Sequence, residues 1–445
     1  MFNKILIANR GEIAVRIIRS CMEMGIKTVA IYSEEDADSL HTHMANEAVC
    51  VGPKEPSKSY LNIPAIISAA EITDAEAIHP GYGFLAENSR FAEICETCGV
   101  KFIGPSSDII RSMGDKVVAR QMMQKAGVLT VPGTEGGVEN NNEALDMAHS
   151  IGFPVMIKAA GGGGGKGMRI VHTDASFLNA FMAAQSEAVS SFDNPCLYVE
   201  KFIENPRHVE FQIIGDNFGN IIHLGDRDCS IQRRYQKLIE ESPSPFLDGK
   251  LRKEMGEIAI KAANALHYSS VGTVEFLLDE SGEFYFMEMN TRIQVEHPVT
   301  EMVTGLDLVK EQIKIAAGER LPWKQTDIQF LGHAIECRIN AENPKSFIPC
   351  PGKISNVHLP GGPGIRIDTA IYQECNIPPY YDSLVAKLIS YGRDRNEAIT
   401  RMRRALDEFV CEGIDTTIPF HREVFSHPDF CNGKINTNFI KNFFD

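Results

Sequence analysis

This sequence of 445 residues lacks features that would direct it to a membrane or to nucleic acid. No apolar run approaches the length of about 18 residues that a membrane-spanning helix needs, and no signal peptide pattern precedes the first expected strand. Positive charge is scarce, because 44 Lys and Arg stand against 59 Asp and Glu. The net charge of −15 opposes binding to nucleic acid or to anionic membranes. We therefore expect a cytoplasmic protein with two or three domains that binds neither.

The sequence also lacks a cysteine framework. Its 11 cysteines are odd in number and scattered, which is typical of a reducing compartment. Cys95 and Cys98 form a CxxC pair, but no second pair or histidine cluster completes a zinc site. Because both fall within a helical pattern at 89–98, we interpret them as structural thiols.

Short strands and helices alternate in the N-terminal part of the chain. Strands are expected at 4–8, 28–32, 48–51, 75–79 and 101–104, and helices at 11–24, 61–70 and 89–98. This alternation predicts an α/β fold with a doubly wound parallel sheet. The first strand-to-helix turn lacks the GxGxxG of a dinucleotide site, which argues against a nicotinamide dehydrogenase. Tyr82 follows the end of a strand, where open sheets bind ligands, although a purely structural glycine turn explains it equally well.

The rest of the chain indicates a small α/β lobe followed by a larger region of mixed α+β character. Helices are expected at 115–126, 142–150, 176–189, 249–266 and 396–409, strands at 155–159, 334–339 and 385–390, a hairpin at 209–224, and a turn cluster at 349–364. No internal repeat or low-complexity stretch interrupts this order.

Residues 161–167 read GGGGGKG. So many glycines cannot form a stable helix or strand interior, and their natural use is a mobile flap whose backbone N–H groups approach phosphate oxygens. The run is not a Walker A loop, because Ala160 and Gly167 stand where that pattern needs Gly and Ser or Thr. Lys158 and Lys166 add two phosphate-seeking charges, whereas a flexible surface linker remains the alternative.

An expected hairpin at 273–288 places two carboxylates together. If its pairing centres between Ser281 and Gly282, Glu275 lies opposite Glu288 with side chains about 5 Å apart. Their repulsion is then roughly 3 kcal/mol at an effective dielectric near 20. A divalent cation relieves it, and with Asn290 the set offers the hard oxygen ligands that Mg²⁺ takes. Plain ion pairing with Lys or Arg is the alternative.

The run from 288 to 296 alternates polar and apolar residues with the period of an extended chain. Its polar members are Glu288, Asn290, Arg292, Gln294 and Glu296. Eight steps of about 3.3 Å span roughly 26 Å, which is too long for the polar side chains to converge on one small ligand. We therefore expect the chain to bend after Thr291, so that the last three polar residues fold back toward the first two. A solvated outer strand is the alternative.

Two further segments carry weaker signals. Residues 198–203 are interpreted as a strand that continues into a connecting segment. Backbone groups in such segments commonly form hydrogen bonds with the edge of an adenine ring. Residues 207–212 and 226–237 are rich in charge, and the plainest interpretation of both is a solvated, salt-bridged face. Composition alone assigns no role to their individual residues.

Taken together, these motifs resemble the biotin carboxylase family along essentially the whole chain. The resemblance rests on ANRGEIAVR (8–16), HPGYGFLAEN (79–88), KAAGGGGGKGMR (158–169), RHVEFQ (207–212), DRDCSIQRRYQK (226–237), EFYFMEMNTRIQVEHPVTE (283–301) and ECRINAE (336–342). It implies a Rossmann-like domain at 1–113, an ATP-grasp domain at 114–330 with a mobile glycine-rich lid at about 131–203, and a C-terminal mixed β/α domain at 331–445.

The resemblance also implies a role for each site residue. ATP is bound by Lys116, Lys158, Gly163, Gly164, Gly165, Glu200, Lys201, Ile203, His208 and Gln232, and Mg²⁺ or Mn²⁺ by Glu275, Glu288 and Asn290. Bicarbonate is held by Lys237, Arg292, Gln294 and the Val295 backbone, while Glu296 is the base, Arg338 stabilises enolate-like biotin, and Tyr82 positions biotin. The implied enzyme is a ligase that makes carboxyphosphate and then carboxybiotin.

The same resemblance implies partners. Stand-alone members are homodimers and act as one component of acetyl-CoA carboxylase in fatty-acid synthesis. No Met-Lys-Met biotin-acceptor sequence occurs, so biotin is expected on a separate carrier protein, with carboxyltransferase subunits elsewhere. Tyr235 departs from the family, where His is frequent, which puts a titratable role there in doubt. The alternatives are another ATP-grasp ligase acting through an acyl phosphate, or a non-catalytic nucleotide-sensing protein.

Overall fold

The computed structural model describes residues 1–134, 136–159, 168–192 and 195–444. Its N-terminal part is a parallel sheet in the order β3-β2-β1-β4-β5, which confirms the doubly wound prediction. The strands are β1 (Lys4–Ile7), β2 (Lys27–Ser33), β3 (Glu47–Gly52), β4 (Ala77–His79) and β5 (Lys101–Phe102). The helices are α1 (Gly11–Glu23), α2 (Leu40–Met44), α3 (Ile63–Ile72), α4 (Ser89–Thr97) and α5 (Ser107–Gly114), with short 3-10 turns η1 (Glu34–Asp36) and η2 (Pro56–Lys58).

Both faces of this parallel sheet are covered. Ile5 and Ile7 of β1 pack into one apolar core, whereas Leu6 between them packs into another. This alternation is the reason that the strand is apolar throughout. The arrangement leaves the carboxyl ends of β1 and β4 free to present the turns at 8–12 and 80–83.

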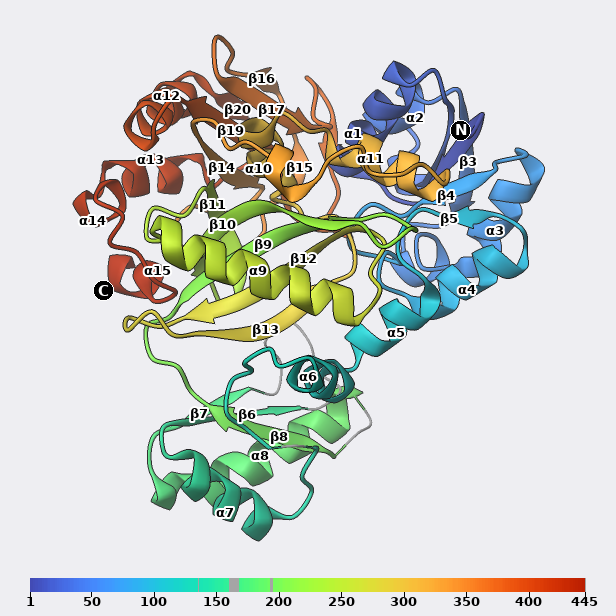
Figure 1. The fold of residues 1–445 in the computed structure, drawn as a ribbon. Coiled ribbons are helices and arrows are strands. Elements are labelled where there is room, and N and C mark those ends of the chain that lie inside the picture. Colours follow the sequence, from blue (N-terminus) through green and yellow to red (C-terminus); the bar gives the residue numbers. More distant parts are fainter. Residues whose placement is uncertain (135, 160–167, 193–194, 445) are drawn as a thin grey trace.

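One antiparallel sheet of eight strands forms the centre of the molecule, in the order β13-β12-β9-β10-β11-β14-β19-β17. Its strands are β9 (Arg207–Gly215), β10 (Ile221–Arg233), β11 (Gln236–Ser242), β12 (Ser270–Leu278), β13 (Phe284–Asn290), β14 (His333–Asn340), β17 (Ile365–Thr369) and β19 (Leu384–Gly392). The pairing of β11 with β14 makes the central and C-terminal parts share this sheet. Helix α9 (Gly249–Ala265) crosses one face of it (Figure 1).

The remaining elements surround the C-terminal half of that sheet. They are α10 (His297–Thr304), α11 (Leu308–Ala316), η3 (Gln325–Asp327), α12 (Arg395–Glu408), α13 (Ile418–Ser426), α14 (Pro428–Cys431) and α15 (Phe439–Phe444), with the short strands β15 (Gly352–Lys353), β16 (Asn356–His358), β18 (Asn376–Ile377) and β20 (Val410–Glu412). The turn cluster expected at 349–364 thus also holds two short strands.

A small lobe lies apart from the rest, at the bottom of Figure 1. It contains α7 (Asn141–Ile151), β6 (Val155–Ala159), β7 (Arg169–Val171), α8 (Asp174–Phe192) and β8 (Leu197–Lys201), and α6 (Lys116–Lys125) lies between it and the central sheet. Its three strands, ordered β7-β6-β8, share a separate apolar core that includes Phe177 and Phe181. The expected α/β lobe is therefore present among the described residues.

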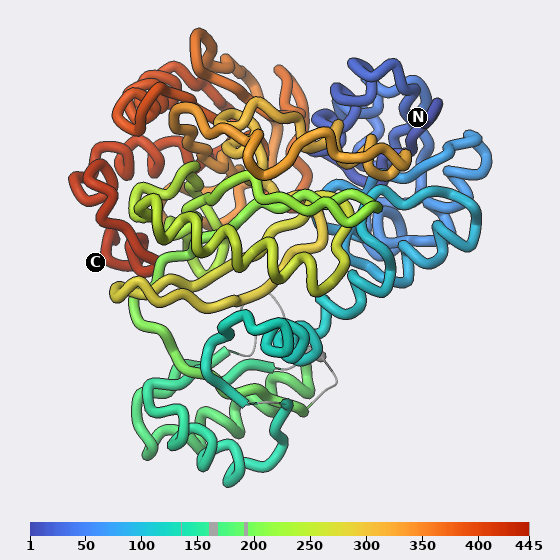
Figure 2. The backbone as a smooth tube through the Cα atoms, viewed as in Figure 1, coloured from blue at the N-terminus to red at the C-terminus, as the bar shows by residue number. Residues whose placement is uncertain are grey.

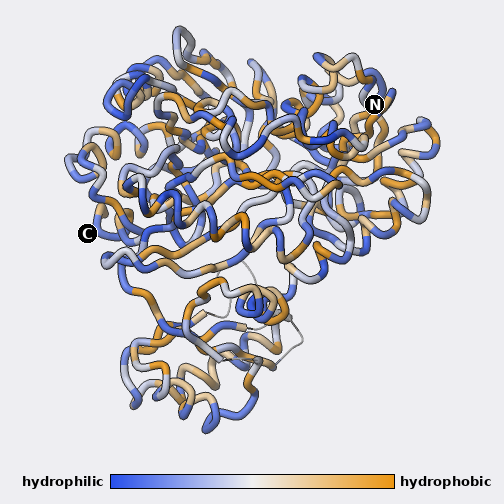
Figure 3. Tube along the Cα trace, viewed as in Figure 1, coloured by the Kyte–Doolittle hydropathy of each residue, from blue (hydrophilic) through white to orange (hydrophobic). Residues whose placement is uncertain are grey.

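The path of the chain keeps the three parts distinct. Figure 2 shows the N-terminal segment on one side of the central sheet and the C-terminus on the other. In Figure 3 hydrophobic and hydrophilic residues are mixed along the strands at the centre of the molecule. No helix among the described residues combines the length and the hydropathy needed to cross a membrane.

Candidate active site

A cleft of about 1400 Å³ opens where the N-terminal part, the small lobe and the central sheet meet. Nearly all site residues expected from the sequence line it, namely Tyr82, Lys116, Lys158, Glu200, Lys201, Ile203, His208, Gln232, Lys237, Glu275, Glu288, Asn290, Arg292, Gln294, Val295 and Arg338. Glu296 is fully buried beside it. Gly163, Gly164 and Gly165 lie outside the described residues.

The β12–β13 hairpin places two carboxylates opposite each other. Glu275 pairs with Glu288, as the sequence predicted. Closer to the turn, however, the strands pair about Ser281, half a residue away from the expected centre. A bulge at Met287 adds one residue to β13 and brings Glu288 back into register with Glu275. The predicted pairing centre is therefore confirmed for Thr273 to Glu275, whereas the strands beyond the bulge pair about Ser281.

The same row continues across the sheet. Glu275 also pairs with Glu210 of β9, and Glu210 pairs with Arg227 of β10. Directly opposite residues share one face of a sheet, so three acids and one arginine form a line over four strands. The Lys237 ammonium lies over this line, 2.6 Å from Glu210 and 3.0 Å from Glu275. The cations offset the repulsion between the acids.

The predicted bend after Thr291 is present, since β13 ends at Asn290. Glu87 of the N-terminal part holds the bend, accepting hydrogen bonds from the Thr291 N–H at 3.1 Å and from Arg292 Nε at 2.8 Å. Arg292 also reaches back to Asn290 Oδ1 at 3.1 Å. Gln294 donates to Glu275 Oε1 at 2.9 Å. The residues after the bend thus fold back onto the hairpin, as the chain-length argument required.

Glu296 has no exposed surface. Its two carboxylate oxygens pair with different cations, Lys237 at 2.7 Å and Arg338 at 2.9 Å. Burial by itself raises the pKa of Glu296, but Lys237, Arg338 and the nearby Arg227 outweigh it and hold that pKa well below its ordinary value. Glu296 is therefore an ionised carboxylate at neutral pH.

Arg227 was not singled out from the sequence, and it anchors the whole network. It is fully buried and donates to Glu210 at 2.5 Å and to Gln212 at 2.6 Å. The side chains of Thr300 and Thr273 accept two further hydrogen bonds, at 2.9 and 3.0 Å. Residues 226–232 of the charged run are buried in β10, so the interpretation of this part as a solvated face was wrong, whereas residues 234–236 at the hairpin tip are exposed. Only the position of its partners on other strands could have revealed this.

Across the cleft, the small lobe contributes the lysines that were expected near a nucleotide. Lys158 forms an ion pair with Glu200, which connects β6 to β8. The Lys201 side chain is directed to two backbone carbonyls just before β6, at 3.0 and 3.1 Å. Lys116 begins α6, and its charge lowers the pKa of Glu288, although burial and Glu275 raise that pKa more strongly. Cations and acids therefore face each other across the opening.

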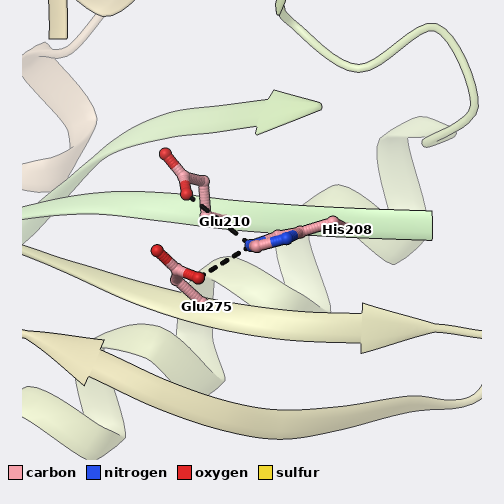
Figure 4. A group of neighbouring side chains, drawn as sticks. All are labelled: His208, Glu210 and Glu275. Atoms are coloured by element: carbon pink, nitrogen blue, oxygen red, sulfur yellow. Dashed lines mark ion pairs between the residues drawn. The ribbon is translucent and has the colours of Figure 1, made fainter. Parts of the chain in front are cut away.

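Among the residues that the structure describes, two groups of side chains lie close enough to hold a metal ion. One consists of His208, Glu210 and Glu275, and Figure 4 shows both carboxylates directed toward the imidazole. His208 Nε2 lies 2.8 Å from Glu275 and 3.9 Å from Glu210. Glu210, however, is already held by Arg227 and Lys237. The second group consists of Glu210, Cys229 and Glu296, and its second acid, Glu296, is held by Lys237 and Arg338.

The residues expected to hold Mg²⁺ suit that ion by their chemistry. Glu275 and Glu288 offer carboxylate oxygens from neighbouring strands, and Asn290 lies beside them, donating to Glu275 at 2.7 Å. Burial and the charge of Glu275 raise the pKa of Glu288, and Lys116, Lys237 and His208 offset this rise only in part. A divalent ion between these oxygens would supply the missing positive charge.

The two tyrosines noted in the sequence have different surroundings. Tyr82 lies in the turn after β4 and donates a hydrogen bond to Glu12 of α1. Tyr235 lies at the tip of the β10–β11 hairpin, at the rim of the cleft, and is 56% exposed. Arg234 and Tyr235 have φ angles of 49° and 67°, as a two-residue type I′ turn requires. Tyr235 is therefore a rim residue with its side chain in solvent.

Comparisons with known proteins agree with this architecture. Residues 1–110 match the biotin carboxylase N-terminal domain, 115–324 the carbamoyl-phosphate synthase L chain ATP-binding domain, and 336–442 the biotin carboxylase C-terminal domain. Biotin carboxylase 1 of Bacillus subtilis is 59% identical over 445 residues, covering 100% of this chain and 99% of the relative. A pyruvate carboxylase subunit of Methanothermobacter thermautotrophicus is 55% identical over 441 residues, covering 99% and 90%.

A solved structure agrees as closely. The dimer of the biotin carboxylase domain of Hydrogenobacter thermophilus 2-oxoglutarate carboxylase, in complex with MgADP, ADP and bicarbonate, matches with a TM-score of 0.96 and 50% identity, covering 100% of this chain and 99% of that chain. Sequence identity over the full length and the shared fold lead to the same assignment. This chain belongs to the biotin carboxylase family, the ATP-dependent ligases that carboxylate biotin.

Proposed function

We propose that this ligase carboxylates biotin carried on a separate protein, with bicarbonate as the carbon source and carboxyphosphate as the intermediate. The observation that carries the proposal is Glu296, a buried, ionised carboxylate held between Lys237 and Arg338 at the end of the bend. It lies next to the acidic pair of the hairpin, with the cations of the small lobe across the cleft. An ionised base, donors for an anion and oxygens for a metal ion are thus within one cleft.

In the first step, bicarbonate becomes a nucleophile. Glu296 takes its proton, a bicarbonate oxygen attacks the γ-phosphorus of ATP, and the bond from that phosphorus to the β-phosphate oxygen breaks. Carboxyphosphate and ADP result. Lys237, Arg292, Gln294 and the Val295 backbone orient bicarbonate for this attack. When the anion engages Lys237, it weakens the ammonium's hold on Glu296, which makes that carboxylate more basic at the moment when it must accept a proton.

The nucleotide occupies the side of the cleft that faces the small lobe. We assign its phosphates to Lys116, Lys158 and the glycines at 163–165, and its adenine and ribose to Glu200, Lys201, Ile203, His208 and Gln232. Glu275, Glu288 and Asn290 would hold Mg²⁺ or Mn²⁺, and a metal ion there neutralises charge on the transferring phosphoryl group. The match to an ATP-binding domain over residues 115–324 supports this placement.

In the second step, carboxyphosphate breaks at its carbon–oxygen bond to give CO₂ and phosphate. The phosphate takes the proton from the biotin ureido nitrogen, and that nitrogen attacks CO₂. Arg338 stabilises the enolate-like oxygen that forms on biotin, because its guanidinium faces the cleft from β14. Tyr82 positions the biotin ring from the N-terminal part.

We further propose the setting of this activity. Three domains at 1–113, 114–330 and 331–445 form one protomer of a homodimer in the cytoplasm. Together with a biotin carboxyl carrier protein and carboxyltransferase subunits, the homodimer forms an acetyl-CoA carboxylase that acts in fatty-acid synthesis. The Bacillus subtilis relative is named as a biotin carboxylase, which supports a biotin carboxylase that is separate from its partner subunits. The Methanothermobacter thermautotrophicus relative, named as part of a pyruvate carboxylase, makes pyruvate the competing acceptor.

Two assays test these statements in turn. ADP formation should require bicarbonate and rise with added free biotin. Stimulation by an amino acid or a purine precursor, without a bicarbonate requirement, would instead indicate another ATP-grasp ligase, and no ADP formation would indicate a non-catalytic protein. With the carrier and carboxyltransferase subunits of the same organism added, labelled bicarbonate should enter malonyl-CoA from acetyl-CoA. Labelled oxaloacetate from pyruvate would overturn the fatty-acid setting alone.

A further inference from the structure

Lys387 is a buried cation that the steps above do not use. It lies in β19, has no exposed surface, and is directly opposite Arg338 of β14. On its other side it is opposite Asp368 of β17. Directly opposite residues share one face of a sheet, so Lys387 and Arg338 are neighbours on the same face. A second cation thus accompanies the one that we assign to biotin.

The Lys387 ammonium connects three separate segments. It donates a hydrogen bond to the Val295 carbonyl at 3.0 Å, within the bend that carries the bicarbonate residues. It lies 3.2 Å from Glu12 in the first turn of α1 and 3.9 Å from Asp368. The N-terminal part, the bend and the C-terminal part therefore meet at one nitrogen atom.

Glu12 extends this connection to the biotin end of the cleft. It lines the cleft and accepts a hydrogen bond from the Tyr82 hydroxyl through the same oxygen that faces Lys387. Its other oxygen is buried and has no hydrogen-bond partner among the described residues. The Lys387 ammonium also lies 5.9 Å from the centre of the Tyr82 ring.

Neutralising a buried charge does not explain these contacts. Asp368 is already paired with Arg366 through two hydrogen bonds, at 3.0 and 2.7 Å, which leaves Glu12 as the closer acid for Lys387. A purely structural lysine needs a carboxylate partner, but it needs neither the Val295 carbonyl nor a carboxylate bonded to Tyr82. The extra contacts join the two places where the substrates would bind.

We propose that Lys387 and Glu12 are positioning residues for biotin carboxylation, and that their ion pair fixes the bicarbonate-binding bend relative to Tyr82. This inference rests on the proposed function. Lys387 holds the peptide that orients bicarbonate, and Glu12 holds the tyrosine that positions biotin. The pair therefore sets the distance between the point where CO₂ forms and the biotin nitrogen. Misplacement of reacting groups by about 1 Å can cost roughly 100-fold in rate.

Glu12 of this pair titrates near neutral pH. Burial raises the pKa of Glu12 to about 7, with Lys387 opposing that rise and Asp368 adding to it. Arg366 and the Tyr82 hydroxyl also act on Glu12, and His297, whose pKa is lowered by burial and by Lys387, lies near the lysine. Glu12 is ionised above its pKa, so the ion pair is complete at higher pH and is lost as the pH falls through about 7.

The test compares Lys387→Met, Glu12→Gln and the double variant with the wild type, in kcat, in KM for bicarbonate and free biotin, and in Tm. Lys387→Met should lower kcat by about 10-fold or more. Glu12→Gln should raise the KM for biotin more than that for bicarbonate, and should remove the wild-type rise of this KM below pH 7. The double variant leaves no unpaired charge, so its Tm should recover while its kcat stays low.

Recovery of both Tm and kcat in the double variant would overturn the inference, because Lys387 and Glu12 would then serve only to neutralise each other's charge. If Lys387→Met fails to fold, the double variant and Glu12→Gln still show whether the ion pair positions the substrates or only neutralises charge. Arg395→Met is the matched control, since Arg395 pairs with the buried Glu241 at 2.6 Å outside the cleft and should lower Tm with kcat unchanged. A wild type without bicarbonate-dependent ADP formation would refute the proposed function instead.

Discussion

Replacing Glu296 by glutamine removes one negative charge from a network that holds Lys237, Arg338 and Arg227. Each lost contact, at 2.7 Å to Lys237 and 2.9 Å to Arg338, is a charged hydrogen bond. Both cations keep other acids, because Lys237 also pairs with Glu210 and Arg338 with Glu240. The expected loss of folding free energy is therefore only about 1–3 kcal/mol, less than that for a buried charge left alone.

The loss of activity should be much larger than the loss of stability. A general base contributes about 10²–10⁴-fold to rate, so bicarbonate-dependent ADP formation should fall by that factor. Nucleotide binding should stay within about twofold of the wild type, because the nucleotide contacts lie on the other side of the cleft. The assay is steady-state ADP release with and without bicarbonate, together with calorimetric titration of ADP.

The pH dependence provides a second check on Glu296. Its folded-state pKa is lowered, so its contribution to stability is present above the unfolded pKa of about 4.3 and is lost only as the pH falls through the lower folded value. The stability difference between wild type and Glu296→Gln should be constant from pH 6 to pH 8. A turnover within about threefold of the wild type would refute Glu296 as the base.

Three further outcomes follow. Glu288→Gln should raise the Mg²⁺ concentration for half-maximal activity by about tenfold or more, since one hard ligand is lost, and an unchanged requirement would remove Glu288 from the metal site. Burial raises the pKa of Glu240 to about 7, so the folded state binds a proton that the unfolded state has lost, and the free energy of unfolding of the wild type falls as the pH rises toward 7. Glu240→Gln should weaken this fall, as measured by urea unfolding at several pH values. The same dependence on pH in the variant and the wild type would contradict this prediction. Arg227→Leu should cost about 3–5 kcal/mol in the same assay by leaving Glu210 without its buried partner, and a loss below about 1 kcal/mol would contradict that role.

The local features of the site could be predicted from the sequence. Alternation of polar and apolar residues identified the hairpin, and the reach of an extended chain required the bend after Thr291. Alternating strands and helices predicted the N-terminal sheet. The pairing of Glu275 with Glu288 was also predicted, but the bulge at Met287, which shifts the register of the pairs nearer the turn, was not. A bulge has no period of its own, so the pattern could not show it.

The long-range partners could not be predicted in the same way. Glu87 is 205 positions away from Arg292, and Glu12 meets Lys387 only because α1, the bend and β19 pack together. The segment that contains Arg227 was interpreted as a solvated face, because the buried acceptors of Arg227 lie on other strands and leave no local pattern. The continuous sheet from β13 to β17 could not be predicted either, since the pairing of β11 with β14 leaves no local pattern in the sequence.

The central claim is that bicarbonate is activated by phosphorylation in this cleft. Bicarbonate labelled with ¹⁸O in all its oxygens tests it directly, through the mass of the phosphate released during biotin-dependent turnover. Carboxyphosphate requires that one bicarbonate oxygen remain on phosphorus when the carbon–oxygen bond breaks. We therefore predict one ¹⁸O atom in each phosphate formed. Unlabelled phosphate, formed at the same rate as carboxybiotin, would contradict the account.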